Sequence, residues 1–147
     1  MKLAHAVAAA AALAVSTGTL AQTTIGGCTI APKASCSKAQ MKRASLATMD
    51  LSGADLSGAN LQEAKASGAK FVGANLQNTD FDTADLRKAD FSNANLRGAN
   101  LTGANMTGAI TTGANLNIVV WSNTICPDGT NSNSNGNIRA NITHKHG

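Results

Sequence analysis

The sequence lacks the side chains on which most enzyme active sites depend. Its 147 residues contain no Tyr, one Trp and three Phe, so aromatic residues make up 3% of the chain. The three histidines lie near the termini, at His5, His144 and His146, so no Ser-His-Asp or Cys-His arrangement can form within the body of the chain. The aspartates therefore have no histidine partner for acid–base chemistry. The sequence predicts a protein that is not an enzyme, with no catalytic residue and no cofactor.

A strong excess of one charge is also lacking. Between Met41 and Ile125, seven Lys and Arg residues face seven Asp and Glu residues. The formal net charge of the whole chain is only +4. Capture of a polyanion requires a patch of one sign, so the composition argues against nucleic acid as a partner.

Metal-binding patterns are weak. Residues 131–135 alternate Asn with other residues like the start of a calcium loop, but they include no carboxylate, and Ile142 stands where a bidentate Glu is required. His144 and His146 offer two ligands in a polar tail, which is fewer than a stable metal site needs. We therefore expect no metal.

The N-terminus has the layout of a secretory signal. Lys2 precedes an apolar run of 13 residues from Leu3 to Val15, and small and polar residues follow up to Ala21. The run is too short to span a bilayer. We expect a signal peptide over residues 1–21 and an exported protein, periplasmic or secreted.

A lipid anchor is the alternative at this end of the chain. The residues Ile25-Gly26-Gly27-Cys28 loosely resemble a lipid-attachment box. Such a box adjoins the apolar run, whereas this one comes well after it, so we expect no stable membrane anchor.

Three cysteines would enter an oxidising compartment after export. Cys28 and Cys36 flank Pro32, and we expect them to form a disulfide that holds an N-terminal cap over residues 22–43. Cys126 is left over, and two alternatives stay open: burial against the last repeat, or a bridge to a second molecule.

The most regular feature of the chain is a period of five residues. Stepping by five from Leu46 to Trp121 gives sixteen positions, of which fourteen carry a large apolar residue. Two residues before these positions stands Ala in thirteen cases, and between the two stands Asp or Asn in eleven. Neither a helix nor an ordinary strand has this period. A coil that turns a corner every five residues does, with the large residue and the Ala pointing inward and the polar residue outward.

Units such as Ala54-Asp55-Leu56-Ser57-Gly58 and Ala94-Asn95-Leu96-Arg97-Gly98 resemble the A-(D/N)-L-x-x signature of the pentapeptide-repeat family. The resemblance covers about residues 44–123. It implies an all-β fold, a right-handed quadrilateral parallel β-helix with four pentapeptides per coil and about four coils here. Residues 20 apart then stack, which places Lys65 beside Asp85.

Both ends of such a rod expose unpaired backbone groups and need caps. At the C-terminal end, Ile118, Val119, Val120 and Trp121 break the repeat with continuous apolarity. One interpretation is a final coil sealed by Trp121. The other is a homodimer contact formed by Ile118, Val120, Trp121 and Cys126. We expect residues 124–147 to be a polar, disordered tail.

The function that best fits is that of a non-enzymatic exported protein, a rigid scaffold or protein-interaction surface whose protein partner is unknown. The resemblance also implies an alternative, since some family members mimic DNA and bind gyrase. The balanced charge and the expected export disfavour it. A surface-binding or ice-binding β-helix is a further alternative, which Arg87 and Arg97 disfavour because they would project where a flat array is needed.

Overall fold

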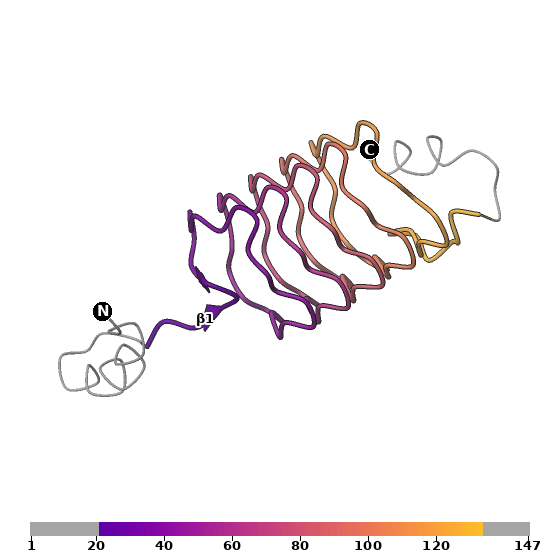
Figure 1. Cartoon of the computed structure of the whole chain (residues 1–147). Helices are drawn as coiled ribbons and strands as arrows, with labels where there is room; N and C mark the ends of the chain where they lie inside the picture. The colour runs from indigo at the N-terminus through magenta and orange to yellow at the C-terminus, as the bar shows by residue number, and fades with distance from the viewer. Residues whose placement is uncertain (1–20, 134–147) are drawn as a thin grey trace.

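The fold is a rod of stacked coils (Figure 1). The structure is a computed structural model, and it describes residues 21–133. The expected signal peptide, apart from Ala21, lies outside the described residues, as does the chain after Asn133. Two short strands at the N-terminal end, β1 (Thr24–Ile25) and β2 (Cys28–Thr29), pair antiparallel.

The coils stack with a constant offset of 20 residues. Parallel single-residue bridges run from Ser35↔Asp55 to Asn105↔Ile125, with a bridge at nearly every fifth residue between them. One coil is therefore four pentapeptides, as the family resemblance implies. Regular turns run from residue 31 to residue 125, so the rod has nearly five coils instead of about four.

The corners of the coil between residues 31 and 119 are tight turns, each within one pentapeptide. The Ala N–H donates to the carbonyl of the large apolar residue three positions earlier, as in Ala54 N–H to Leu51 O at 3.0 Å. The residue before the Ala has a positive φ, 68° at Gly53, which a type II turn requires. This explains why Gly and Asn recur at that position.

The outward Asp and Asn side chains stabilise the turn that follows them by hydrogen bonds. Their Oδ1 atoms accept the backbone N–H two residues later, as Asp55 does from Ser57 at 3.1 Å and Asp80 does from Asp82 at 3.0 Å. Only a short side chain with an acceptor oxygen closes this ring. The preference for Asp and Asn at this position of the repeat therefore has a structural cause.

The core is a single apolar column along the inside of the rod. The residues at every fifth position from Met41 to Met106 are buried, with 0–1% of their surface exposed. In its middle, Phe71 and Phe91 stack with ring centroids 5.1 Å apart, and Phe81 meets both edge-on at 6.1 and 6.2 Å. These rings lie in the coils around Ala66, which is itself fully buried.

Two buried threonines replace Ala in the inward row. Thr79 Oγ1 donates to Leu56 O at 2.8 Å, and Thr124 Oγ1 donates to Leu101 O at 2.7 Å. Both side chains are fully buried, and these bonds satisfy their hydroxyl groups.

The coil begins earlier than the expected boundary between cap and repeat at residues 43 and 44. Cys36 and Met41 occupy the large inward positions of the first coil and are 3% and 1% exposed. Apolar burial does not require Leu or Phe, so residues outside the signature can extend the coil. The N-terminal cap is thus limited to the segment around β1 and β2.

The chain also stays ordered beyond the expected end of the rod. The expectation of a disordered tail from residue 124 is wrong for residues 124–133. The chain turns after Cys126 and runs back antiparallel, with a bridge between Ile125 and Asn131 and a bond from Ser132 N–H to Thr124 O at 2.8 Å. These contacts satisfy part of the edge of the last coil.

Candidate interaction surface

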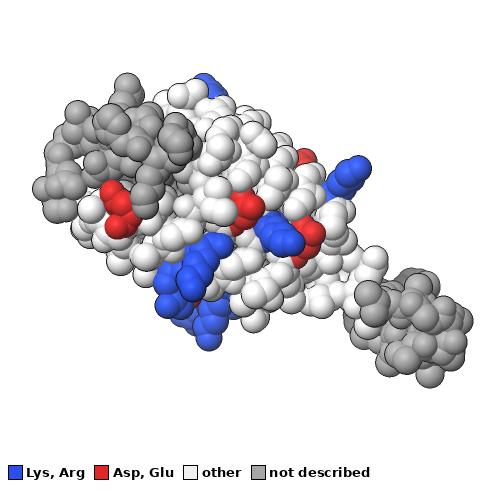
Figure 2. Space-filling view, turned by 180° about the vertical axis from the view of Figure 1, so that it is seen from behind, with Lys and Arg blue, Asp and Glu red and all other residues white. Residues whose placement is uncertain are grey.

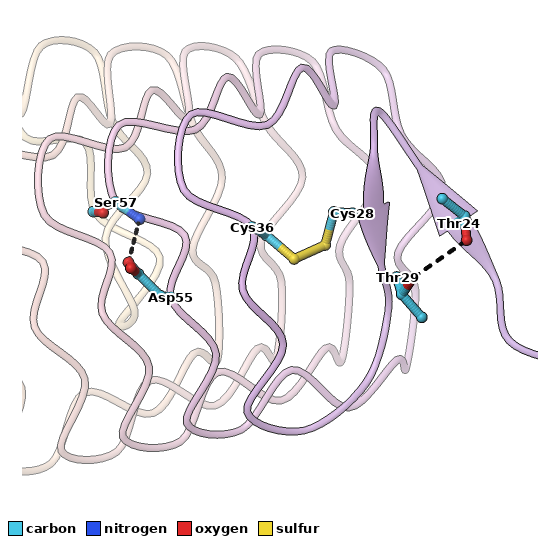
Figure 3. The surroundings of a disulfide bond; sticks show 6 residues. All are labelled: Thr24, Cys28, Thr29, Cys36, Asp55 and Ser57. Carbon is cyan, nitrogen blue, oxygen red and sulfur yellow. Dashed lines mark hydrogen bonds between the residues drawn. A yellow bond between two sulfur atoms is a disulfide. The ribbon is translucent and has the colours of Figure 1, made fainter. Parts of the chain in front are cut away.

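The N-terminal end is closed by a disulfide-linked cap. Cys28 and Cys36 are joined in the structure, with Cα atoms 5.0 Å apart and both side chains buried (Figure 3). The turn between the strands lies directly on the first coil, because a Cβ added at Gly26 would overlap the carbonyl of Gln40. The cap therefore covers part of the edge of the first coil, and the expected pair of cysteines does come together.

The C-terminal end is only partly closed. Ile118 and Val120 are 69% and 48% exposed. Ile118 also has φ of 51°, a conformation that a β-branched residue adopts only with strain. Both side chains thus lie at the surface of the described end of the rod.

The other two members of the expected interface are less exposed. Cys126 is 2% exposed and Trp121 is half-buried against the core. Cys126 continues the five-residue register and takes the large inward position above Met106. Burial, and next the charge of Asp128, raise the pKa of the Cys126 thiol, which makes it less reactive. Of the two alternatives for Cys126, the structure therefore fits burial and not an intermolecular bridge.

The hairpin that follows Cys126 explains why Trp121 and Cys126 are more buried than Ile118 and Val120. Ser132 Oγ donates to Trp121 O at 2.7 Å, and Asn133 Oδ1 accepts the Asn123 N–H at 3.1 Å. The hairpin covers the edge from about residue 121 to residue 126. It leaves the edge from residue 111 to residue 120 open within the described part of the chain.

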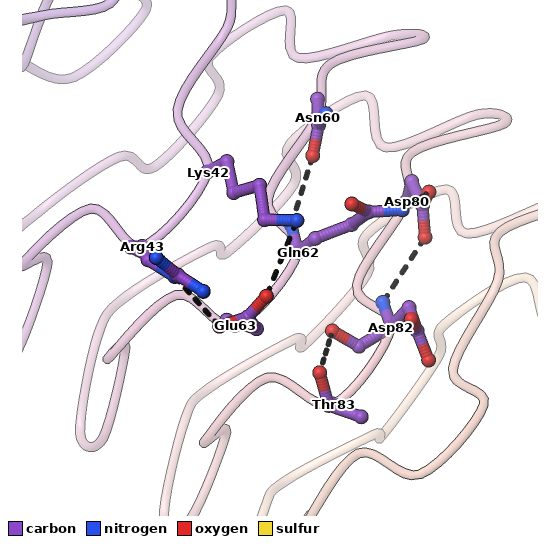
Figure 4. A network of polar contacts seen from close by, with 8 residues as sticks. All are labelled: Lys42, Arg43, Asn60, Gln62, Glu63, Asp80, Asp82 and Thr83. Atoms are coloured by element: carbon purple, nitrogen blue, oxygen red, sulfur yellow. Dashed lines mark hydrogen bonds and ion pairs between the residues drawn. The ribbon is translucent and has the colours of Figure 1, made fainter.

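The sides of the rod carry polar side chains that bond to one another. On one face, Glu63 accepts a bond from Arg43 at 2.7 Å and lies 3.2 Å from the Lys42 ammonium, while Gln62 donates to Asp80 at 2.7 Å (Figure 4). On another face, Asp85 pairs with Arg87 of its own turn at 2.6 Å. Asp85 is bridged to Lys65 through the backbone only.

Four carboxyl groups have lowered pKa values. The Arg43 and Lys42 bonds lower the pKa of Glu63, and the Arg87 bond lowers that of Asp85. Hydrogen bonds from Ser52 and Ser57 lower the pKa values of Asp50 and Asp55. A general acid needs a raised carboxyl pKa, so none of these four groups can serve as one at neutral pH.

The face drawn in Figure 2 carries charges of both signs. One face shows mostly uncharged surface, with acidic residues in separate spots beside basic ones and one group of basic side chains at its lower edge (Figure 2). Within residues 21–133, nine Lys and Arg residues face eight Asp and Glu residues. Among residues 21–133, the exposed large apolar side chains are Ile110, Ile118 and Val120.

Neither a metal-binding cluster nor a membrane-spanning helix occurs among the described residues. Residues 21–133 contain no group of three or more His, Cys, Asp or Glu side chains placed to hold a metal ion. None of the described residues forms a helix with the length and apolarity needed to cross a membrane.

Comparisons with known proteins agree on the fold. The family profile "Pentapeptide repeats (8 copies)" matches residues 34–78, 50–87 and 84–117. Among solved structures, the chain is similar to HetL, a pentapeptide repeat protein involved in heterocyst differentiation regulation in the cyanobacterium Nostoc sp. strain PCC 7120. The identity is 34% and the TM-score 0.57, covering 67% of this chain and 52% of HetL.

A second similar structure is AT2G44920, a pentapeptide repeat protein from the Arabidopsis thaliana thylakoid lumen. It is 35% identical with a TM-score of 0.56, and the match covers 58% of this chain and 59% of that protein. The chain thus spans only about half to three-fifths of the length of these two proteins. No match was found among curated proteins.

Pentapeptide repeat proteins fold as right-handed quadrilateral β-helices and are generally non-enzymatic structural or interaction proteins. The profile match over residues 34–117, the 20-residue stacking offset and the four-sided coil all agree. The chain belongs to the pentapeptide-repeat family.

Proposed function

We propose that the protein is an exported, non-enzymatic rod that serves as a rigid scaffold or protein-interaction surface in the cell envelope or outside the cell. The observation that carries this is the division between inside and outside: the inward rows are apolar and closed, and the polar side chains lie on the outer faces. Small-molecule sites are concave, whereas solenoids bind through extended outer surfaces. The function therefore depends on the faces and ends of the rod.

Export is supported by the signal-like layout of residues 1–21 and by the Cys28–Cys36 pair, which an oxidising compartment would keep closed. Intact-mass measurement of protein recovered from periplasm and medium tests this. We expect a chain that starts at Gln22 and is lighter than the reduced form by two hydrogens. Retention of residues 1–21, or a lipid on Cys28, would contradict the proposal.

A second copy of the chain is the candidate partner at the C-terminal end. The observation that favours it is the exposure of Ile118 and Val120 at the open part of the last coil. Apolar side chains at a sheet edge favour association with another chain, and charges at an edge oppose it.

Sedimentation of the wild type and of Val120→Lys, with Cys126 reduced, tests the end contact. We expect self-association of the wild type and a monomer for Val120→Lys, because an unpaired ammonium would have to lose its water in the contact. Ile110→Lys is the matched control: Ile110 is 47% exposed, but it lies half a coil away from Val120 along the chain. A wild type that is monomeric at all micromolar concentrations would refute the end contact.

Two other functions of such rods have less support. DNA mimicry of the gyrase-binding kind needs a strongly acidic surface, which eight acidic residues against nine basic ones in residues 21–133 do not provide. Binding to ice needs a flat, regular array, which the exposed Arg87 and Arg97 side chains interrupt.

A further inference from the structure

The open edge of the last coil presents specific backbone hydrogen-bonding groups. In the coils below, each outward residue makes two backbone bonds with the preceding coil: Asn95 N–H donates to Ala74 O at 2.9 Å, and Asn95 O accepts from Leu76 N–H at 2.8 Å. In the last coil, the equivalent groups are Ala114 O and Leu116 N–H. Neither has a partner among residues 21–133.

The apolar side chains at this position are also uncovered. Ala94 and Leu96 are 1% and 0% exposed, because the next coil lies on them. Ala114 and Leu116 are only half-buried, although they have the same inward orientation. Residues 21–133 therefore do not include a strand that places a small residue over Ala114, a large one over Leu116 and an outward residue between them.

The hairpin at the end does not supply that strand. Asn133 is the last described residue of the hairpin, and its side-chain amide donates to Asn123 Oδ1 at 2.7 Å on a different side of the coil. Residues 134–147, which lie outside the described residues, continue the chain from that point.

The sequence of this remaining segment contains one further repeat unit. Ala140-Asn141-Ile142-Thr143-His144 matches the A-(D/N)-L-x-x signature with Ile in the large position. The three coils below present Ala-Asn-Leu in the same column, at residues 74–76, 94–96 and 114–116. The position above Val119 to Trp121 is a poorer fit, because neither Ala nor Asn occurs there.

The asparagine in this unit would extend an existing ladder. Asn115 Nδ2 donates to Asn95 Oδ1 at 3.1 Å, and Asn75 Nδ2 donates to Asp55 Oδ1 at 3.1 Å. An Asn above Asn115 can donate to Asn115 Oδ1 in the same way. Stacked Asn side chains of this kind add hydrogen bonds along a parallel stack.

The chain that links the hairpin to this repeat unit is short. The six residues 134–139 can span up to about 20 Å. A short flexible linker gives an effective concentration of the order of millimolar. The segment of the same chain is therefore favoured over that of another molecule at micromolar protein.

We propose that residues 140–144 bind in cis along Ala114–Ile118 as a parallel strand, with Asn141 between Ala114 O and Leu116 N–H and Ile142 on Leu116. The segment begins a further coil and occupies the edge beside Ile118. Its regulatory consequence rests on the proposed end contact: the bound segment competes with a second copy for this edge.

Amide exchange measured by NMR on the full chain tests the proposal. We expect the Leu116 amide to exchange at least tenfold faster in Ile142→Lys than in the wild type. Ile138→Lys is the matched control, because it changes another tail Ile that lies outside the repeat unit, and it should leave this rate unchanged. The Leu96 amide, bonded to Asn115 O at 2.9 Å, should stay protected in all three proteins and so reports that the coils remain folded.

The outcomes separate this inference from the proposed function. Equal exchange at Leu116 in wild type and Ile142→Lys would overturn the cis contact, as would protection that appears only with dimer formation at rising concentration. Sedimentation reads the end contact independently: stronger association of Ile142→Lys supports the competition. If the Leu116 amide is protected in the wild type and neither the wild type nor Ile142→Lys self-associates, the result would support the cis strand and refute the end contact.

Discussion

Truncation of Phe91 tests the assigned core most directly. Phe91 is fully buried, stacks on Phe71 at 5.1 Å and meets Phe81 edge-on at 6.2 Å. Removal of a buried Phe side chain leaves a cavity and costs about 3–5 kcal/mol. Phe91→Leu keeps most of the apolar volume but loses two ring contacts, each worth about 0.5–1.5 kcal/mol, so we expect a loss of about 1–3 kcal/mol.

Urea unfolding followed by far-UV circular dichroism measures these changes, with Trp121 fluorescence as a second probe at the end of the rod. Thr112→Ala is the control, because Thr112 is exposed on the same side of the coil, and it should change the free energy of unfolding by less than about 0.5 kcal/mol. A loss for Phe91→Ala no larger than that of the control would refute the inward register. Noncoincident transitions of the two probes would indicate that the end coil unfolds separately.

Three further substitutions test other features. Ala66→Leu should destabilise the protein by about 1–3 kcal/mol, because the three Phe rings crowd the middle of the rod, whereas Ala47→Leu on the exposed side should be near neutral in the same urea titration. Ile118→Asn should raise the thermal midpoint, since Asn tolerates the positive φ of 51° better than a β-branched residue; a lower midpoint would show that Ile118 contributes packing that outweighs its strain. Asp85 has a lowered pKa, so its contribution to stability is present above its unfolded pKa and lost as pH falls through the lower folded one. Asp85→Asn should therefore reduce the difference in unfolding free energy between pH 7 and pH 2.5, by less than about 1 kcal/mol for a surface pair, and an unchanged difference would show that the Arg87 bond does not stabilise the fold.

The structure also shows which features of the repeat have local causes. The turn bond from Ala54 to Leu51 and the Asp55 bond to Ser57 each lie within a few residues of sequence. Such bonds depend only on neighbouring residue types, so they recur with the period and make it visible. The inward register of Leu and Ala follows from the same alternation and from burial of the apolar side chains.

The sequence by itself determined the period and the inward and outward positions, and it predicted the pairing of the two cysteines near the N-terminus. The four-unit coil came from the resemblance to the pentapeptide-repeat family. Only the tertiary structure decided where the rod begins and ends. Cys36 and Met41 belong to the first coil because the next coil covers them, and residues 124–133 fold back because the edge of the last coil offers them hydrogen bonds. A cap satisfies backbone groups of residues that are far away in the sequence, and the cap itself has no repeat period. No local sequence pattern therefore predicts it. The buried threonines Thr79 and Thr124 depart from the Ala of the repeat for a related reason. Each hydroxyl group donates to a carbonyl oxygen that lies 23 residues earlier in the sequence, so only the fold shows that the polar side chain is satisfied.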